Sequence, residues 1–298
     1  MNKFTWTISL VASMAGIAAT YPITKALNGA VDPFMLAFLR FFIASLALLP
    51  IILYRRTLSI PRGKELGLFG LIALCAVLPT ALIAISIPLT NSVVAAILIN
   101  TNPLIIVLIA PFLIGEKVTS SKIVGLFIGF CGVVAVVLNG HNPFTELSSS
   151  YLWGTLILLF AALLSALNKT YSRNLVRKYD GLYVTFLGVV LGALALGAIN
   201  VLRGGLSLLP EFTTNVTLSV LTIGIIGTAI PWVVWSNSLK HLDVHIAASF
   251  YLLIPVFATF YSFFFLSEQF TFWMLLGLIL TSIGIYIVQR QEKITTGV

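Results

Sequence analysis

Long apolar runs separated by short polar stretches make up this 298-residue sequence. A helix needs about 20 consecutive apolar residues to cross the hydrocarbon core of a bilayer. Ten runs are long enough, at 4–26, 33–54, 65–86, 91–114, 120–138, 151–172, 182–202, 214–237, 245–266 and 272–289. The pattern therefore predicts an all-α integral membrane protein with ten transmembrane helices.

One part of this pattern occurs twice. Residues 91–119 return as residues 243–271 in a register that also extends beyond both ends. The identical positions include Ala95/Ala247, Ala96/Ala248, Pro103/Pro255, Glu116/Glu268 and Thr119/Thr271, with Pro79/Pro231 before them and Gly125/Gly277 and Gly132/Gly284 after them. Each copy would hold five helices, and an odd number makes the second copy enter the membrane in the opposite sense. We therefore expect two inverted five-helix repeats.

A polar stretch rich in turn-forming residues separates the two copies. It contains Asn, Gly, Pro and Ser, which is typical of a loop. The predicted organisation is a first repeat at 1–138, an extracytoplasmic linker at 139–150, a second repeat at 151–290 and a cytoplasmic tail at 291–298.

The charged residues indicate the orientation of the chain. Only 9% of the residues are charged, against about 25% in soluble proteins. Of the 17 Lys and Arg residues, 13 fall in the termini and loops of one predicted side, whereas only Lys25 and Arg203 fall on the other. Basic loops stay in the cytoplasm, so we expect both termini there. The net charge of +8 then reflects topology beside anionic lipid, and we expect no nucleic-acid partner.

Several classes of function lack their sequence signals. The chain has no HExxH, GxSxG, Walker A or CxxC motif, which argues against a protease, an ATPase or another enzyme. Its two cysteines, Cys75 and Cys131, lie in apolar runs and have no metal-binding spacing. We therefore expect no catalytic residue, no metal and no cofactor.

The ordered set of motifs resembles the EamA-type ten-helix members of the drug/metabolite transporter superfamily over nearly the whole chain. Pro22 and Lys25 close the first helix, Pro33 and Arg40 open the second, and the duplicated Ala-Ala, Pro, Glu and Gly positions complete the set. The resemblance implies a bacterial-type inner-membrane carrier with a central cavity between the repeats, working by alternating access. Similar members export amino acids and other metabolites. The chain departs from the repeat at Arg40, whose counterpart is Gly188.

The repeated prolines and the asparagines beside one of them are candidate substrate-path residues. Pro103 and Pro255 fall near the middle of their predicted helices, where each removes a hydrogen bond and kinks the helix. Asn100 and Asn102 offer amide donors and acceptors beside Pro103, whereas Pro255 follows apolar residues. A packing kink satisfied within the protein is the alternative. Pro79 and Pro231 form a second repeated pair with the same expected role.

The repeated acids have two interpretations. Glu116 and Glu268 lie at the starts of the fifth and tenth helices, where a carboxylate interacts favourably with a helix N-terminus. Structural capping, with Thr119 and Thr271 as N-caps, is one interpretation. The other is a gate on each side of the membrane.

Charged and aromatic residues within the apolar runs are further candidates. Arg40 can extend to the membrane surface, bind backbone carbonyls or bind a substrate carboxylate. Lys169 is four residues from the predicted cytoplasmic end of its helix, and extension to the surface is the favoured interpretation. Trp232, Tyr21 and Tyr251 are candidate walls of the cavity.

The predicted function is a secondary transporter that exports small metabolites such as amino acids. A proton-coupled multidrug exporter stays as an alternative, although all nine acids fall in loops or at helix ends, where no carboxylate serves a buried cation. A carrier or flippase for a lipid-linked or amphipathic substrate is the other alternative. The expected partners are a small-molecule substrate and the lipid bilayer. The chain is expected to be a monomer or a homodimer, because the repeated glycines of the fifth and tenth helices suit a scaffold seam or a dimer contact.

Overall fold

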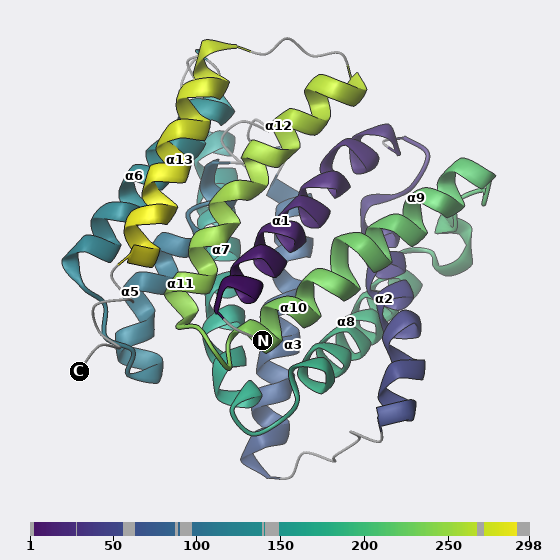
Figure 1. Ribbon diagram of the computed structural model, residues 1–298. Coiled ribbons are helices and arrows are strands. Elements are labelled where there is room, and N and C mark those ends of the chain that lie inside the picture. The colour runs from purple at the N-terminus through teal and green to yellow at the C-terminus, as the bar shows by residue number, and fades with distance from the viewer. Residues whose placement is uncertain are drawn as a thin grey trace. The chain divides into compact units, whose positions relative to one another are not determined.

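A computed structural model describes residues 3–27, 29–55, 63–86, 89, 97–138, 140, 149–266 and 271–290. Within these residues the protein is helical and has no strand. The α-helices are α1 (Lys3–Ala26), α2 (Pro33–Arg55), α3 (Lys64–Ser86), α5 (Asn102–Ile114), α6 (Ser120–Leu138), α7 (Ser149–Val176), α8 (Gly181–Arg203), α9 (Thr214–Gly224), α10 (Ile230–Ser238), α11 (Val244–Ser249), α12 (Leu253–Leu266) and α13 (Phe272–Arg290). Ten helical stretches of this part of the chain are long and apolar enough to cross a membrane, which confirms the predicted all-α membrane fold (Figure 1).

Three of the ten stretches are interrupted helices. The fourth has a turn at Asn100 and Thr101 before α5 begins. The eighth consists of α9, a π-helical segment η3 (Ile225–Ala229) and α10, and the ninth consists of α11, a 3-10 turn η4 (Phe250–Leu252) and α12. The sequence predicted each of these stretches as a single helix, and the structure shows where the ladder of hydrogen bonds changes.

The repeated prolines explain these interruptions. Pro103, Pro231 and Pro255 each lie in the first turn of the later segment, in α5, α10 and α12 respectively. A first turn has backbone N–H groups without intrahelical partners, so a proline costs little there. These three prolines therefore begin a new helical segment instead of bending an intact helix. Pro79 differs, because it lies inside the continuous helix α3.

The chain folds into two compact units, and each unit contains parts of both predicted repeats. Unit 1 consists of Met1–Ala81 and Tyr171–His241, and unit 2 consists of Leu82–Thr170 and Leu242–Val298. The divisions fall within α3 and α7. Sequence repeats and compact units are therefore different divisions of this chain.

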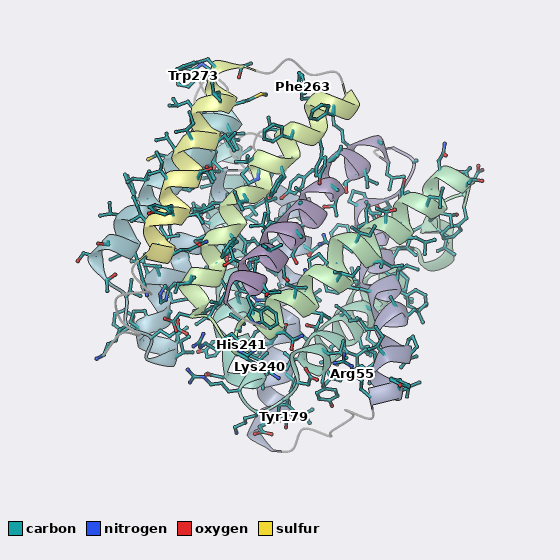
Figure 2. All side chains as sticks on the ribbon, in the orientation of Figure 1. Arg55, Tyr179, Lys240, His241, Phe263 and Trp273 are labelled. Atoms are coloured by element: carbon teal, nitrogen blue, oxygen red, sulfur yellow. The ribbon has the colours of Figure 1, made fainter. Side chains whose placement is uncertain are left out.

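Unit 1 is built around α2, which packs against α8 and α9. Its apolar core joins the end of α1 and the first turns of α2 to α9, through Leu27, Val31, Met35, Leu36, Leu39, Val216, Val220 and Ile223. Arg55, Tyr179, Lys240 and His241 lie toward the same end of this unit in Figure 2. Arg55, Arg177, Lys178 and Lys240 belong to the loops and helix ends that the charge pattern assigns to the cytoplasm.

Unit 2 is built around α6 and α13, which pack along their length (Figure 1). Gly284 of α13 is a point of close approach, since a Cβ added there would lie 2.5 Å from the carbonyl oxygen of Gly125 and from the amide nitrogen of Gly129. A Cβ on Gly132 would lie 2.7 Å from the carbonyl oxygen of Gly277. The glycines therefore let two backbones meet, as small residues do in membrane helix pairs. The seam predicted for these helices is formed within one chain.

Candidate functional site

A polar cluster inside unit 2 brings together two of the predicted site residues around a lysine. The ammonium of Lys169, in α7, donates to Ser165 Oγ at 2.8 Å and to Asn102 Oδ1 at 3.2 Å. It also lies 4.5 Å from the centre of the Tyr251 ring, a distance at which a cation is attracted to an aromatic face. Asn102 and Tyr251 were predicted to face the substrate, and the structure places both beside Lys169.

Local structure explains how these side chains meet. Ser165 and Lys169 are four residues apart on α7, so they lie on one face of the helix. Asn102 is the first residue of α5, directly after the turn in the fourth membrane segment. Its Nδ2 donates to the carbonyl oxygen of Ala162 at 3.3 Å, which turns Oδ1 toward the lysine. Tyr251 comes from the 3-10 turn η4, so the breaks in two membrane segments supply both neighbours.

The direction of the Lys169 side chain contradicts the expectation that it extends to the membrane surface. Its Nζ reaches back to Ser165, one helical turn farther from the end of α7 at Val176, the end predicted to be cytoplasmic. Among the residues that the structure describes, no carboxylate lies within ion-pair distance of this ammonium. A charge within a membrane segment costs several kcal/mol, so such a lysine is expected to have a function.

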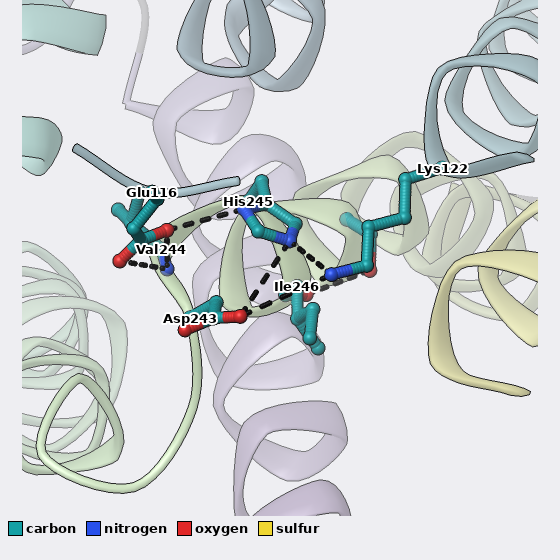
Figure 3. Close-up of polar contacts among 7 residues, drawn as sticks. Glu116, Lys122, Asp243, Val244, His245 and Ile246 are labelled. Atoms are coloured by element: carbon teal, nitrogen blue, oxygen red, sulfur yellow. Dashed lines mark hydrogen bonds and ion pairs between the residues drawn. The ribbon is translucent and has the colours of Figure 1, made fainter. Parts of the chain in front are cut away.

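A second polar cluster of unit 2 surrounds Glu116 (Figure 3). Its carboxylate accepts hydrogen bonds from the backbone N–H of Val244 at 3.0 and 3.3 Å and from His245 Nδ1 at 3.1 Å. Lys122 Nζ lies 2.7 Å from His245 Nε2, and Asp243 Oδ2 is 3.9 Å from both of these nitrogens. Glu116, Lys122 and His245 are all buried.

The contacts of His245 define its protonation. A carboxylate can only accept, and an ammonium can only donate. His245 therefore carries its proton on Nδ1 and accepts from Lys122 at Nε2. Glu116 thus interacts with a helix N-terminus, as one interpretation held, but the helix is α11 and not α6. Glu268, its repeat counterpart, lies outside the described residues.

Three side chains of the same cluster are of types that can bind a metal ion. Ligand atoms of Glu116, Asp243 and His245 lie within 4.8 Å of one another. However, the Lys122 ammonium already supplies positive charge at the imidazole nitrogen that faces Asp243. Lys122 thus balances the negative charge of the carboxylates, and the cluster suits a cap of the N-terminus of α11 better than a site for a metal cation.

In unit 1, Arg40 and Trp232 lie around the π-helical segment η3. Arg40 Nε donates to Thr228 Oγ1 at 2.5 Å and an Nη of Arg40 donates to the carbonyl oxygen of Gly227 at 3.4 Å. These contacts favour the second interpretation of Arg40, binding to backbone carbonyls exposed where a helix changes its pitch. The Trp232 ring packs edge-on against Phe41, with ring centres 5.4 Å apart.

The other predicted residues have separate positions. Tyr21 is 47% exposed within α1. Asn100 is buried at the turn before α5, and Pro79, Pro103, Pro231 and Pro255 are buried as well. The cluster residues missed by sequence reasoning are Ser165, Lys122 and His245. The spacing of Ser165 and Lys169 within an apolar run was the signal available for the first.

Ion pairs mark the helix ends of unit 1. Arg203 donates to both carboxylate oxygens of Asp32, at 2.7 and 3.1 Å. This hydrogen bonding holds the pKa of Asp32 below its usual value. Glu65 pairs with Lys178 at 2.6 Å and accepts from the hydroxyl of Tyr179, which raises the pKa of that hydroxyl.

Ten apolar helical stretches with polar clusters inside them define a multi-pass membrane protein. Its sequence matches the profile of the EamA-like transporter family twice, over residues 4–138 and 152–290. The chain belongs to the EamA-like transporter family, and it is a membrane transporter of this class.

Individual relatives agree with this assignment. An uncharacterized transporter of Archaeoglobus fulgidus is 28% identical over 262 residues, 88% of this chain and 89% of the relative. The uncharacterized transporter YoaV of Bacillus subtilis is 24% identical over 86% of this chain and 87% of its own. A WAT1-related chloroplastic protein of Arabidopsis thaliana is 26% identical over 97% of this chain and 68% of its own. A solved crystal structure aligns with a TM-score of 0.85 at 19% identity, covering 98% of this chain and 99% of that one, which shows the fold alone.

Proposed function

We propose that the protein is a secondary transporter that exports small metabolites, such as amino acids, across the cytoplasmic membrane by alternating access. The observation that carries this proposal is the cluster of Lys169, Asn102 and Ser165 inside membrane-spanning helices. Polar and charged groups within membrane segments are expensive, and they typically mark a substrate or ion pathway. The interrupted fourth and ninth segments support it, because broken helices form binding sites in transporters with inverted repeats.

The charges inside the two units favour this proposal over a multidrug exporter for lipophilic cations. A cation is expected to need a buried carboxylate within the membrane. The buried carboxylate of the described residues is Glu116, and its oxygens bind the first amide of α11 and His245. The charged group whose contacts among the described residues are all neutral is instead a cation, the ammonium of Lys169. A lipid-linked substrate has no such observation in its favour.

Efflux from proteoliposomes tests the proposal. The purified protein is reconstituted, the vesicles are loaded with labelled L-leucine, L-threonine or L-phenylalanine, and loss of label is measured against protein-free vesicles. Wild-type protein is expected to accelerate the efflux of at least one compound. Asn102→Ala removes the groups that bind Ala162 and Lys169, and it should slow that efflux about 10-fold.

Asn215→Ala is the matched control, because Asn215 is exposed at the start of α9. It should leave efflux unchanged. If folded wild-type protein moved none of these compounds, the proposed export of amino acids would be refuted. If Asn102→Ala moved them at the wild-type rate, the assignment of the site would be wrong.

A further inference from the structure

We propose that Lys169 binds the carboxylate of the transported compound, so that a free carboxylate is the group by which the protein selects its substrates. This inference rests on the proposed function and adds a substrate class and a specificity-determining residue to it. It starts from the neutral surroundings of the Lys169 ammonium: a hydroxyl, an amide oxygen and an aromatic ring.

Other basic side chains of the two units show what a paired cation looks like in this protein. Arg203 has Asp32, Lys178 has Glu65, and Lys240 has Asp180 at 3.8 Å. Lys122 has a neutral imidazole at 2.7 Å and the carboxylate of Asp243 at 3.9 Å. Lys169 differs because its charge has neutral partners within the described residues, although it lies within a membrane segment. An anionic ligand is the partner that such a charge favours most.

The neighbours of Lys169 suit a carboxylate in particular. A carboxylate has two oxygens that accept hydrogen bonds. The ammonium can donate to one of them, and the Ser165 hydroxyl, 2.8 Å from the ammonium, can rotate to donate to the other. Asn102 is held by Ala162, so its Oδ1 stays on the lysine and fixes the ammonium in place.

Part of the site is accessible. Lys169, Ser165 and Tyr251 are partly exposed, whereas Asn102 is buried. The Tyr251 ring covers one side of the ammonium, so a carboxylate has to approach from the accessible remainder. A phosphate carries up to two charges, and a single lysine with neutral neighbours matches a singly charged carboxylate better.

The first test varies the ligand and leaves the protein intact. Reconstituted wild-type protein is assayed for efflux of L-leucine, L-leucinamide and isoamylamine, which share a side chain but differ at the carboxylate. The same comparison is made with L-phenylalanine and its amide, and with inorganic phosphate. Efflux of the acids should exceed that of the amides and the amine by about 10- to 100-fold. Equal efflux of acids and amides would overturn the inference, and preferred efflux of phosphate would do so as well.

The second test varies the protein. Lys169→Gln should lower efflux of the acids about 10- to 100-fold, and Lys169→Arg, which keeps the charge, should retain more of it. Lys240→Gln is the control, because it removes the same charge from an exposed position in unit 1. Wild-type rates in Lys169→Gln would refute the role of the lysine while leaving the transporter function intact.

A binding measurement separates failure of the inference from failure of the proposed function. L-leucine should raise the melting temperature of the detergent-solubilised wild-type protein, and L-leucinamide should not. This comparison needs no variant, so a poorly folded Lys169→Gln protein would not obscure it. Absence of all efflux together with selective stabilisation by the acid would refute export and support the carboxylate site. Stabilisation by the amide as large as that by the acid, or none by either, would refute the site.

Discussion

The glycine seam between α6 and α13 allows a prediction with a calculated size. Gly284→Ala adds one methyl group whose carbon would lie 2.5 Å from Gly125 O, 2.5 Å from Gly129 N and 2.6 Å from Gly129 Cα. An ordinary contact starts at 3.4 Å, so α13 would have to retreat by about 0.9 Å because backbone atoms cannot rotate away. Such overpacking costs about 1–3 kcal/mol, and the better helix propensity of Ala returns up to about 1 kcal/mol.

The net expectation is a loss of about 2 kcal/mol, since three backbone atoms are contacted at once. At roughly 2–4 °C per kcal/mol, the melting temperature in detergent should fall by about 4–8 °C. Gly188→Ala is the matched control, because a Cβ at Gly188 in α8 would meet nothing within 4 Å. It should leave the melting temperature unchanged or raise it. A Gly284→Ala protein as stable as the wild type would show that the two helices are not packed this closely.

Two further predictions concern charged groups. Lys122→Met should lower the free energy of unfolding by about 1–3 kcal/mol, because it leaves the buried Nε2 of His245 without its hydrogen-bond donor and removes the cation paired with Asp243. The exposed Lys117→Met should have little effect, and equal melting temperatures of the two variants would contradict this. Asp32 stabilises the protein through Arg203, and its pKa is lowered in the folded state. The stabilisation is therefore complete above the ordinary aspartate pKa of about 3.9. It is lost as the pH falls through the lowered pKa of the folded protein. Asp32→Asn keeps a side-chain oxygen for the N–H groups of the first turn of α2. The difference in melting temperature between wild type and Asp32→Asn should correspond to less than about 1 kcal/mol at pH 7 and shrink as the pH falls through the pKa of folded Asp32. A difference that does not decrease with falling pH would contradict the assignment to the charge.

Sequence reasoning predicted what depends on local pattern. Length and apolarity were sufficient for the ten membrane segments, and the repeated glycines indicated which helices approach closely. The repeated prolines indicated irregularities, but a proline alone does not show whether a helix bends or ends, because this depends on how neighbouring helices satisfy the freed carbonyls. The structure shows new segments beginning at Pro103, Pro231 and Pro255.

The predictions that were wrong concern contacts with residues distant in sequence. Lys169 was expected to extend to the membrane surface, but its ammonium binds Ser165, one turn away, and Asn102, 67 residues earlier. Glu116 was placed correctly near a helix end, but the helix that it caps begins 128 residues later at Val244. His245 is fully buried between Glu116 and Lys122, which lie more than 120 residues before it. The pattern of apolar and polar residues along the chain does not predict such contacts between side chains, because they form only when the helices pack together.

Each unit consists of two stretches that are far apart in the sequence, and this has a consequence for biosynthesis. Residues 1–81 pack with residues 171–241, and residues 82–170 pack with residues 242–298. During translation, the first three membrane segments are therefore made before their partners in unit 1, because the next three segments belong mainly to unit 2. Unit 2 cannot be completed before the last helix leaves the ribosome, because α13 supplies half of the glycine seam. A gene divided at the 139–150 linker should accordingly give two fragments that are each unstable alone and assemble when they are made together.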